Sequence, residues 1–175
     1  MRIITVLMIL SLAVNTLAQD IHFSQFLANS FMLNPAMVGL QKSDYKVTLH
    51  RKSQWASVSV PFTTFTLALE RKDVLPSHSI GVQCLNDIAG DSRLKTLGLN
   101  FTYVKSIAIS KLNTFRFGAD FGVFQRSITI NDLVFNNPEN LSDFNFSFLD
   151  FSLGFANHNY LNENLLLENG IAFFH

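Results

Sequence analysis

Cysteine and charge are both scarce in this sequence of 175 residues. Cys84 is the single cysteine, which excludes an internal disulfide framework and a cysteine-rich metal site. Charged residues make up 15% of the chain and sum to a formal net charge of zero, so charge gives no support for a nucleic-acid partner. The five histidines are scattered, and neither a Gly-x-Ser-x-Gly elbow nor a phosphate-binding loop is present. We therefore predict a protein that is not an enzyme and uses no cofactor, metal or small-molecule substrate.

Long apolar stretches are also missing after the first eighteen residues. Residues 1–18 have the pattern of a cleavable signal peptide, with Arg2, an apolar stretch over 3–14, and the small residues Thr16 and Ala18 before the cleavage site. The protein is therefore expected to be exported. No later stretch reaches the roughly eighteen apolar residues of a transmembrane helix. An exported chain of this kind is expected to be secreted, periplasmic or a β-barrel.

Phenylalanine, in contrast, is abundant, and its spacing in residues 115–126 is informative. Phe115, Phe117 and Phe121 alternate with Arg116 and Asp120, so an extended strand would have one apolar face and one polar face. The stretch is longer than the ~5–6 residues of a typical soluble strand and fits the ~9–11 needed to cross a bilayer. We predict that the Phe-rich face contacts lipid. The alternative is a half-buried strand of a secreted β-sandwich.

The same alternation recurs along the chain and predicts seven strands. They are expected at residues 45–54, 64–70, 80–84, 96–103, 115–126, 149–156 and from about 165, with turns or loops at 71–77, 86–91, 106–112 and 127–143. Phe151 and Phe155 join the lipid-facing set. The predicted fold class is all-β: an antiparallel up-and-down transmembrane β-barrel, incomplete because bacterial barrels usually have an even number of at least eight strands. The expected organisation is a signal peptide at 1–18, a periplasmic or barrel-capping segment at 19–43 and a partial barrel at 44–175.

Four charged residues fall on the inward face of the expected strands. They are Glu70, Arg116, Asp120 and Asp150. Arg116 and Asp120 are four residues apart on one strand, ~13 Å, so each needs a partner elsewhere. Two roles remain open: an internal polar network that holds the barrel together, or a lining that touches a passenger or a plug. Glycines also share the inward face, where they allow internal groups to approach the wall; these are Gly98, Gly118, Gly122 and Gly154.

Several short motifs resemble a known family. They comprise Asp20, His22, Phe23, Ser24 and Gln25, then Asn34, Pro35, Ala36 and Gly39, then Trp55 at the end of an Arg-x-x-Gln-Trp element, and Asp87 with Gly90. Together they resemble the PorP/SprF family, outer-membrane proteins of the type IX secretion and gliding-motility apparatus of Bacteroidota. The resemblance spans most of residues 20–160. Family members are considerably longer, so it implies the N-terminal half, or a fragment, of such a barrel.

The resemblance implies a non-enzymatic component of the outer membrane that supports secretion or surface display of proteins such as adhesins. The implied partners are other type IX secretion components, a secreted adhesin and outer-membrane lipid. The N-terminal motifs are expected at the periplasmic mouth, and residues 127–143 are expected to form a long outer loop. Two alternatives remain: a passive outer-membrane diffusion channel and a secreted, soluble β-sandwich binding module.

Overall fold

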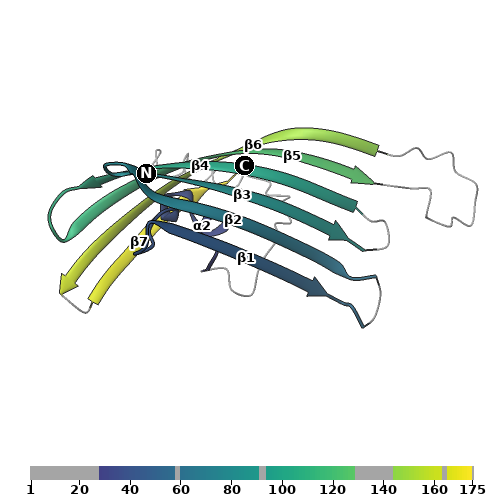
Figure 1. Ribbon diagram of the computed structural model, residues 1–175, viewed down its shortest axis with the longest axis horizontal. Helices are drawn as coiled ribbons and strands as arrows, with labels where there is room; N and C mark the ends of the chain where they lie inside the picture. The colour runs from purple at the N-terminus through teal and green to yellow at the C-terminus, as the bar shows by residue number, and fades with distance from the viewer. Residues whose placement is uncertain (1–27, 58–59, 91–93, 129–143, 163–164, 175) are drawn as a thin grey trace, which may run out of the picture.

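A computed structural model of the chain describes residues 28–57, 60–90, 94–128, 144–162 and 165–174. These residues form one seven-stranded sheet in which every strand pairs antiparallel with the next one along the chain (Figure 1). The strands are β1 (Tyr45–Gln54), β2 (Phe62–Leu75), β3 (His78–Ala89), β4 (Leu94–Ala108), β5 (Asn113–Ile128), β6 (Phe144–Asn162) and β7 (Leu165–Phe173). The α-helix α2 (Ser30–Leu33) and the 3-10 helix η2 (Pro35–Met37) precede them. The predicted all-β, up-and-down fold class is confirmed.

β1 has the predicted bounds, whereas β2 to β6 are longer than the alternation predicted. β2 continues to Leu75, so the turn expected at 71–77 shrinks to Pro76 and Ser77. Most of the loop expected at 86–91 is strand, because β3 continues to Ala89, and β4 extends to Ala108 inside the turn expected at 106–112. These boundaries were wrong because backbone pairing with a neighbouring strand continues where the side-chain pattern has faded. Residues 129–143, most of the expected outer loop, lie outside the described residues.

The sheet is strongly curved and open, with β1 and β7 at its edges (Figure 1). This arrangement is half of a barrel wall. The helices α2 and η2 lie on its concave face (Figure 1). A second sheet, which a β-sandwich requires, is absent from the part of the chain that the structure describes. Within those same residues, no helix is long and apolar enough to cross a membrane.

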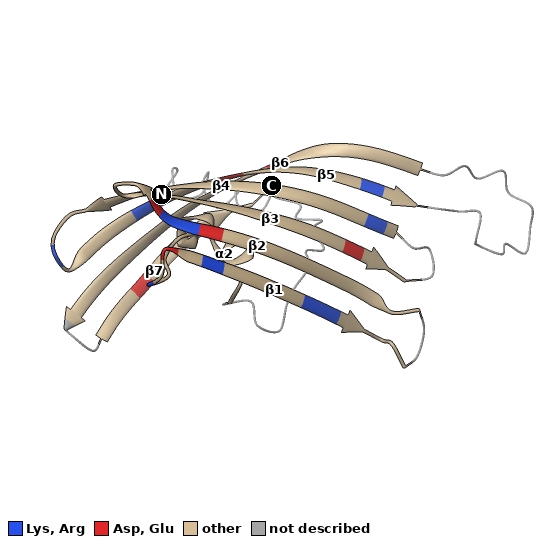
Figure 2. Ribbon diagram, in the orientation of Figure 1, with Lys and Arg blue, Asp and Glu red and all other residues tan. Residues whose placement is uncertain are grey.

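The convex face consists of apolar rows that cross six strands. Because opposite residues of paired strands share a face, each row follows the hydrogen-bonded register. One row contains Val47, Leu69, Val82, Phe101, Phe121 and Phe151. These side chains remain between 39% and 68% exposed, so no described part of the protein covers them. Charged residues lie mainly toward the ends of the strands (Figure 2).

The concave face is largely polar, and its apolar core is small. Phe31, Val38, Ala68 and Val104 form that core between the N-terminal helices and the sheet. Gly81 makes room for it, since a Cβ there would lie 2.7 Å from both the Phe31 ring and Val38. The apolar contact of the N-terminal helices with the wall is therefore limited, and polar groups have to supply much of their attachment.

At one end of β5 and β6 the concave face becomes apolar and the convex face becomes polar. There the concave face carries stacked rings: the Phe124 and Phe148 centroids are 5.4 Å apart, and those of Phe146 and Phe148 are 5.6 Å apart. The convex face at the same level is polar, with Gln125 donating a hydrogen bond to Asn145 over 3.1 Å. The apolar convex band therefore has a defined limit along these two strands.

Candidate functional site

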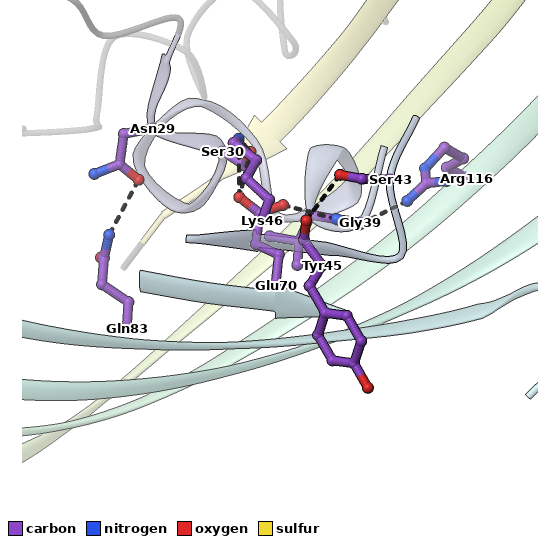
Figure 3. Close-up of polar contacts among 10 residues, drawn as sticks. Asn29, Ser30, Gly39, Ser43, Tyr45, Lys46, Glu70, Gln83 and Arg116 are labelled. Carbon is purple, nitrogen blue, oxygen red and sulfur yellow. Dashed lines mark hydrogen bonds and ion pairs between the residues drawn. The ribbon is translucent and has the colours of Figure 1, made fainter. Parts of the chain in front are cut away.

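The polar centre of the molecule lies where residues 28–41 contact the concave face of the sheet. We call residues 28–41 the anchored segment and the sheet beneath them the wall. Figure 3 shows the side chains that join them, with Glu70 and Lys46 on one side and Arg116 on the other. The segment begins with α2, bends at Asn34 and ends in η2 and Gly39. Asn34 caps η2, because its side-chain oxygen accepts a hydrogen bond from the Ala36 N–H over 2.9 Å.

Asn34 also attaches the bend to two strands. Its side-chain Nδ2 donates to the backbone carbonyls of Phe155 in β6, over 3.0 Å, and Ile171 in β7, over 3.3 Å. One amide group therefore satisfies both the start of η2 and two carbonyls of the wall. An aspartate in this position would lose the two donated bonds, which gives a physical reason for asparagine here.

Beneath this bend the wall carries glycines, which leave no side chain between the sheet and the segment. A Cβ on Gly118 would lie 2.4 Å from the backbone of Pro35 and Ala36, and one on Gly154 would lie 2.1 Å from the Asn34 side-chain oxygen. Contacts this short are not tolerated between real atoms, so only glycine fits at either position. The expected approach of internal groups at these two inward glycines is confirmed. Gly170 on β7 adds to the same patch, which the alternation pattern did not reveal.

Glu70 binds the segment near both of its ends. Its side chain is 1% exposed, and its two oxygens accept hydrogen bonds from the Ser30 hydroxyl over 3.0 Å and the Gly39 N–H over 2.8 Å. Lys46 lies 2.9 Å from the same carboxylate and also donates to the Ser30 hydroxyl (Figure 3). A buried carboxylate needs such partners to remain charged. Gly39 has a φ of +76°, a left-handed conformation that favours glycine.

Arg116 holds the segment from the opposite side. Its Nε donates to the carbonyl of Ala36 over 2.8 Å, and one terminal nitrogen donates to that of Val38 over 2.6 Å. The guanidinium thus binds the end of η2 with two parallel donors, a geometry that lysine cannot reproduce. A further bond joins Gln83 of β3 to the side-chain oxygen of Asn29 over 3.0 Å (Figure 3).

The remaining two inward acids have different surroundings. Asp120 is buried, and its carboxylate accepts hydrogen bonds from the side chains of Asn100, over 2.6 Å, and Thr102, which join β5 to β4. Asp150 is half-buried, and its carboxylate accepts from the N–H of Phe151 over 2.9 Å. Glu70 and Arg116 therefore both bind the anchored segment, whereas Asp120 and Asp150 lie farther along the wall and bind other groups.

The other motif residues lie apart from the anchored segment. Asp20, His22, Phe23, Ser24 and Gln25 lie outside the described residues. Trp55 is exposed beyond the end of β1, and its ring meets the edge of Phe62 at a centroid distance of 4.9 Å. Asp87 is in β3, where it accepts a hydrogen bond from Thr64 over 2.6 Å, and Gly90 follows with a φ of +59°.

The predicted lipid-facing residues all lie on the convex face and all remain exposed. They are Phe115, Phe117, Phe121, Phe151 and Phe155. Phe117 and Phe155 face each other across β5 and β6, with ring centroids 5.1 Å apart and an edge-to-face angle of 81°. They make up part of one continuous apolar surface.

Two shallow clefts lie beside the anchored segment, near the edge strands β1 and β7. Their volumes are about 300 Å³ and about 350 Å³. Leu33, Met37 and Glu168 line both of them. Among the described residues, no group of three or more His, Cys, Asp or Glu side chains is placed to hold a metal ion. The arrangement is thus suited to holding a polypeptide segment in place.

A half-barrel wall with an apolar convex face and a polar, occupied concave face defines the chain as a β-barrel-type membrane protein. The comparison with protein families is specific. The model of the family described as "Type IX secretion system membrane protein PorP/SprF" matches residues 15–164, and the chain belongs to this family. No match was found among curated proteins or among solved structures. Family membership makes the chain a membrane component of the type IX secretion system and implies contact with other components of that system.

Proposed function

We propose that the chain forms part of a barrel wall in the outer membrane, with its convex face in lipid and the anchored segment inside. It acts without catalysis and supports the secretion or surface display of proteins such as adhesins. The observation that carries the location is the set of uncovered apolar rows on the convex face. In water, a surface of this extent would have to be covered by another protein layer.

The pattern of loop lengths supports one orientation. The connections after β2, β4 and β6 span residues 76–77, 109–112 and 163–164, and those after β1, β3 and β5 span 55–61, 90–93 and 129–143. The connections 109–112 and 90–93 are equal in length, and the other two of the second set are longer than any of the first. Outer-membrane barrels have short periplasmic turns and longer external loops. The end that carries the short connections therefore faces the periplasm.

The polarity exchange on β5 and β6 supports the same placement. Val123 and Leu149 end the apolar convex band, and Gln125 and Asn145 follow on the side of the long connections. The convex face is therefore apolar over a band of limited height. A wall leaving a bilayer has such a band, because its convex side passes from hydrocarbon into water.

The test compares two arginine substitutions on the same face of β5. Phe121→Arg places a cation within the apolar band, where it costs ~2–4 kcal/mol on a barrel wall near mid-bilayer, and should largely abolish recovery in the outer-membrane fraction. Gln125→Arg introduces the same side chain four residues away, beyond the band, and should assemble normally. Gly118 on the opposite face is not a suitable control, because any side chain there meets the anchored segment.

Equal assembly of the Phe121→Arg and Gln125→Arg proteins would reject lipid contact. Phe121→Leu, which keeps the surface apolar, should behave as the wild type and separates loss of lipid contact from loss of the ring. In cells that depend on this protein, Phe121→Arg should also leave type IX passengers unsecreted, and normal secretion by that variant would reject the transport role.

A further inference from the structure

A chain of three polar side chains lies on the convex face where the apolar rows end toward the short connections. Lys105 of β4 pairs in register with His78 of β3, and its ammonium nitrogen lies 2.6 Å from His78 Nε2. The other ring nitrogen, Nδ1, is hydrogen-bonded to the hydroxyl of Tyr103. Tyr103 itself is 42% exposed, so the end of this chain is open to the surroundings.

The direction of these hydrogen bonds leaves free N–H and O–H donors at the surface. An ammonium group can only donate, so His78 Nε2 accepts and the ring proton is on Nδ1. Nδ1 then donates to the Tyr103 oxygen, and the Tyr103 O–H points away from the histidine. Because Lys105 carries three protons, it keeps two further donors. An anion is the ligand that such a group of donors can take.

A second cation lies at the same level of the sheet. Tyr45, Arg71, Ile80 and Tyr103 follow one another across β1 to β4 in register. The Arg71 guanidinium is 5.4 Å from the centre of the Tyr45 ring, which holds it at the surface. Arg71 and Tyr103 are two strands apart, ~10 Å, and the guanidinium lies toward β1, so Arg71 adds positive charge beside the Lys105 and Tyr103 donors without sharing their ligand atoms.

Apolar residues begin immediately beyond this level. The next row toward the middle of the wall contains Leu69, Val82 and Phe101, all exposed on the convex face. A free phosphate ion would use the donors and leave these side chains uncovered. A phospholipid would use both, with its phosphate at the donors and its acyl chains along the apolar rows. Tyrosine and basic residues are also typical of the membrane–water interface.

We propose that Tyr103 and Lys105, joined through His78, bind the phosphate of an anionic phospholipid in the periplasmic leaflet; we call these three residues the headgroup site. Tyr45 holds Arg71 beside this site, where it adds a second positive charge. This inference rests on the proposed membrane location and adds a specific ligand to it. Lys105 and Tyr103 donate to the phosphate oxygens directly, and Arg71, on the other side of Ile80, contributes only its charge.

The experiment uses the full chain in lipid nanodiscs that contain phosphatidylcholine with a small fraction of phosphatidylglycerol. Native mass spectrometry then measures how much anionic lipid stays bound when the nanodisc is disrupted. Removing a charge-assisted hydrogen bond costs about tenfold or more in affinity, so Lys105→Gln should reduce retained phosphatidylglycerol about tenfold. Arg71→Gln, which removes only a nearby charge, should reduce it by no more than about fivefold. Tyr103→Phe, which keeps the ring, should have a smaller effect in the same direction.

Lys95→Gln is the matched control. Lys95 is on the same strand and the same convex face as Lys105, near the opposite end of β4. It should cost no more than the roughly fivefold expected of a single cation near an anionic lipid surface. A Lys105→Gln protein that retains lipid like the wild type, or loses no more than Lys95→Gln, overturns the headgroup site. Full competition by inorganic phosphate would assign the site to free phosphate and would equally overturn it.

Failure of the headgroup site is distinguishable from failure of the proposed location. If the location is right, wild-type and Lys105→Gln proteins both fractionate with the outer membrane, whatever lipid they retain. If the location is wrong, the wild type itself does not enter the membrane, and the Phe121→Arg comparison shows this independently.

Discussion

Replacing Glu70 with alanine should release the anchored segment from the concave face while leaving the sheet intact. The backbone of Glu70 pairs with Lys46 and Gly81 in the sheet, and the substitution does not touch those bonds. What is lost is the carboxylate that accepts from the Ser30 hydroxyl and the Gly39 N–H. The backbone hydrogen bonds of the sheet are therefore expected to stay intact.

The magnitude follows from the three contacts. Hydrogen bonds to a charged group contribute ~1.5–3 kcal/mol each, so the two from Ser30 and Gly39 together contribute ~3–6 kcal/mol. The ion pair adds ~1 kcal/mol at most, because the Lys46 side chain is 31% exposed and can turn to water. Taking the lower figure of ~3 kcal/mol, the open state of the segment should be populated about 100-fold more in Glu70→Ala.

Hydrogen exchange of the full-length protein in detergent micelles measures this directly. Amides of residues 30–39 should exchange about 100-fold faster in Glu70→Ala, whereas amides in the centre of β4 and β5 should not change. Glu70→Gln, which keeps one acceptor oxygen, should fall between. Asp120→Ala is the matched control: it also removes a buried concave carboxylate, but one bonded to Asn100 and Thr102 of β4.

Exchange of residues 30–39 within about threefold of the wild-type rate in Glu70→Ala would show that the Glu70 carboxylate does not hold the segment. Equal acceleration by Asp120→Ala would show the same, because the segment would then respond to any loss of concave charge. An equal rise throughout β4 and β5 would show that the effect is global and that the segment is not a separate unit.

Three further outcomes test other parts of the structure. Arg116→Gln should raise exchange in residues 30–39 at least tenfold, and Arg116→Lys should restore only part of the protection, because lysine lacks the planar pair of donors. Gly154→Val should lower the free energy of unfolding in urea by ~1–3 kcal/mol, since its side chain would overlap Asn34. Cys84 lies between Leu67 and Leu99 on the convex face, so a charged maleimide should label it after unfolding but not in intact membranes; rapid labelling in membranes would place it in water.

The alternation of side chains was sufficient to predict the sheet. It identified all seven strands and the face of the first six, because the two faces of a strand differ in polarity wherever one of them is apolar. Strand ends were predicted less well. Between Arg71 and Leu75 the register shifts, and from Asn86 to Ala89 all four side chains are half-buried, so neither stretch has two distinct faces to read.

The position of the anchored segment could not be derived from local pattern. Residues 28–41 do not alternate, and their contacts are with residues far along the chain: Ala36 meets Arg116, 80 positions away, and Asn34 meets Ile171, 137 positions away. The inward glycines gave a partial signal, since they indicated that some internal group approaches the wall. Nothing in their spacing indicated which group. Lys46, Gln83 and Asn29 carried no signal beyond their polar character.

The anchors also connect the segment to the curvature of the wall. Val38 and Gly39 are consecutive residues, yet Val38 is bound by Arg116 of β5 and Gly39 by Glu70 of β2. Those strands are three apart in the sheet, ~14 Å across a flat one. Because side chains stand roughly perpendicular to a sheet, curvature of the strands between them brings these two side chains toward consecutive residues. The polar bonds that hold the segment therefore also favour the curved form of the sheet, and curvature in turn brings Glu70 and Arg116 within reach. Glu70→Ala should consequently loosen the arc from β2 to β5 as well as the segment, an effect that a spin-label distance between those two strands would register as a broader distribution.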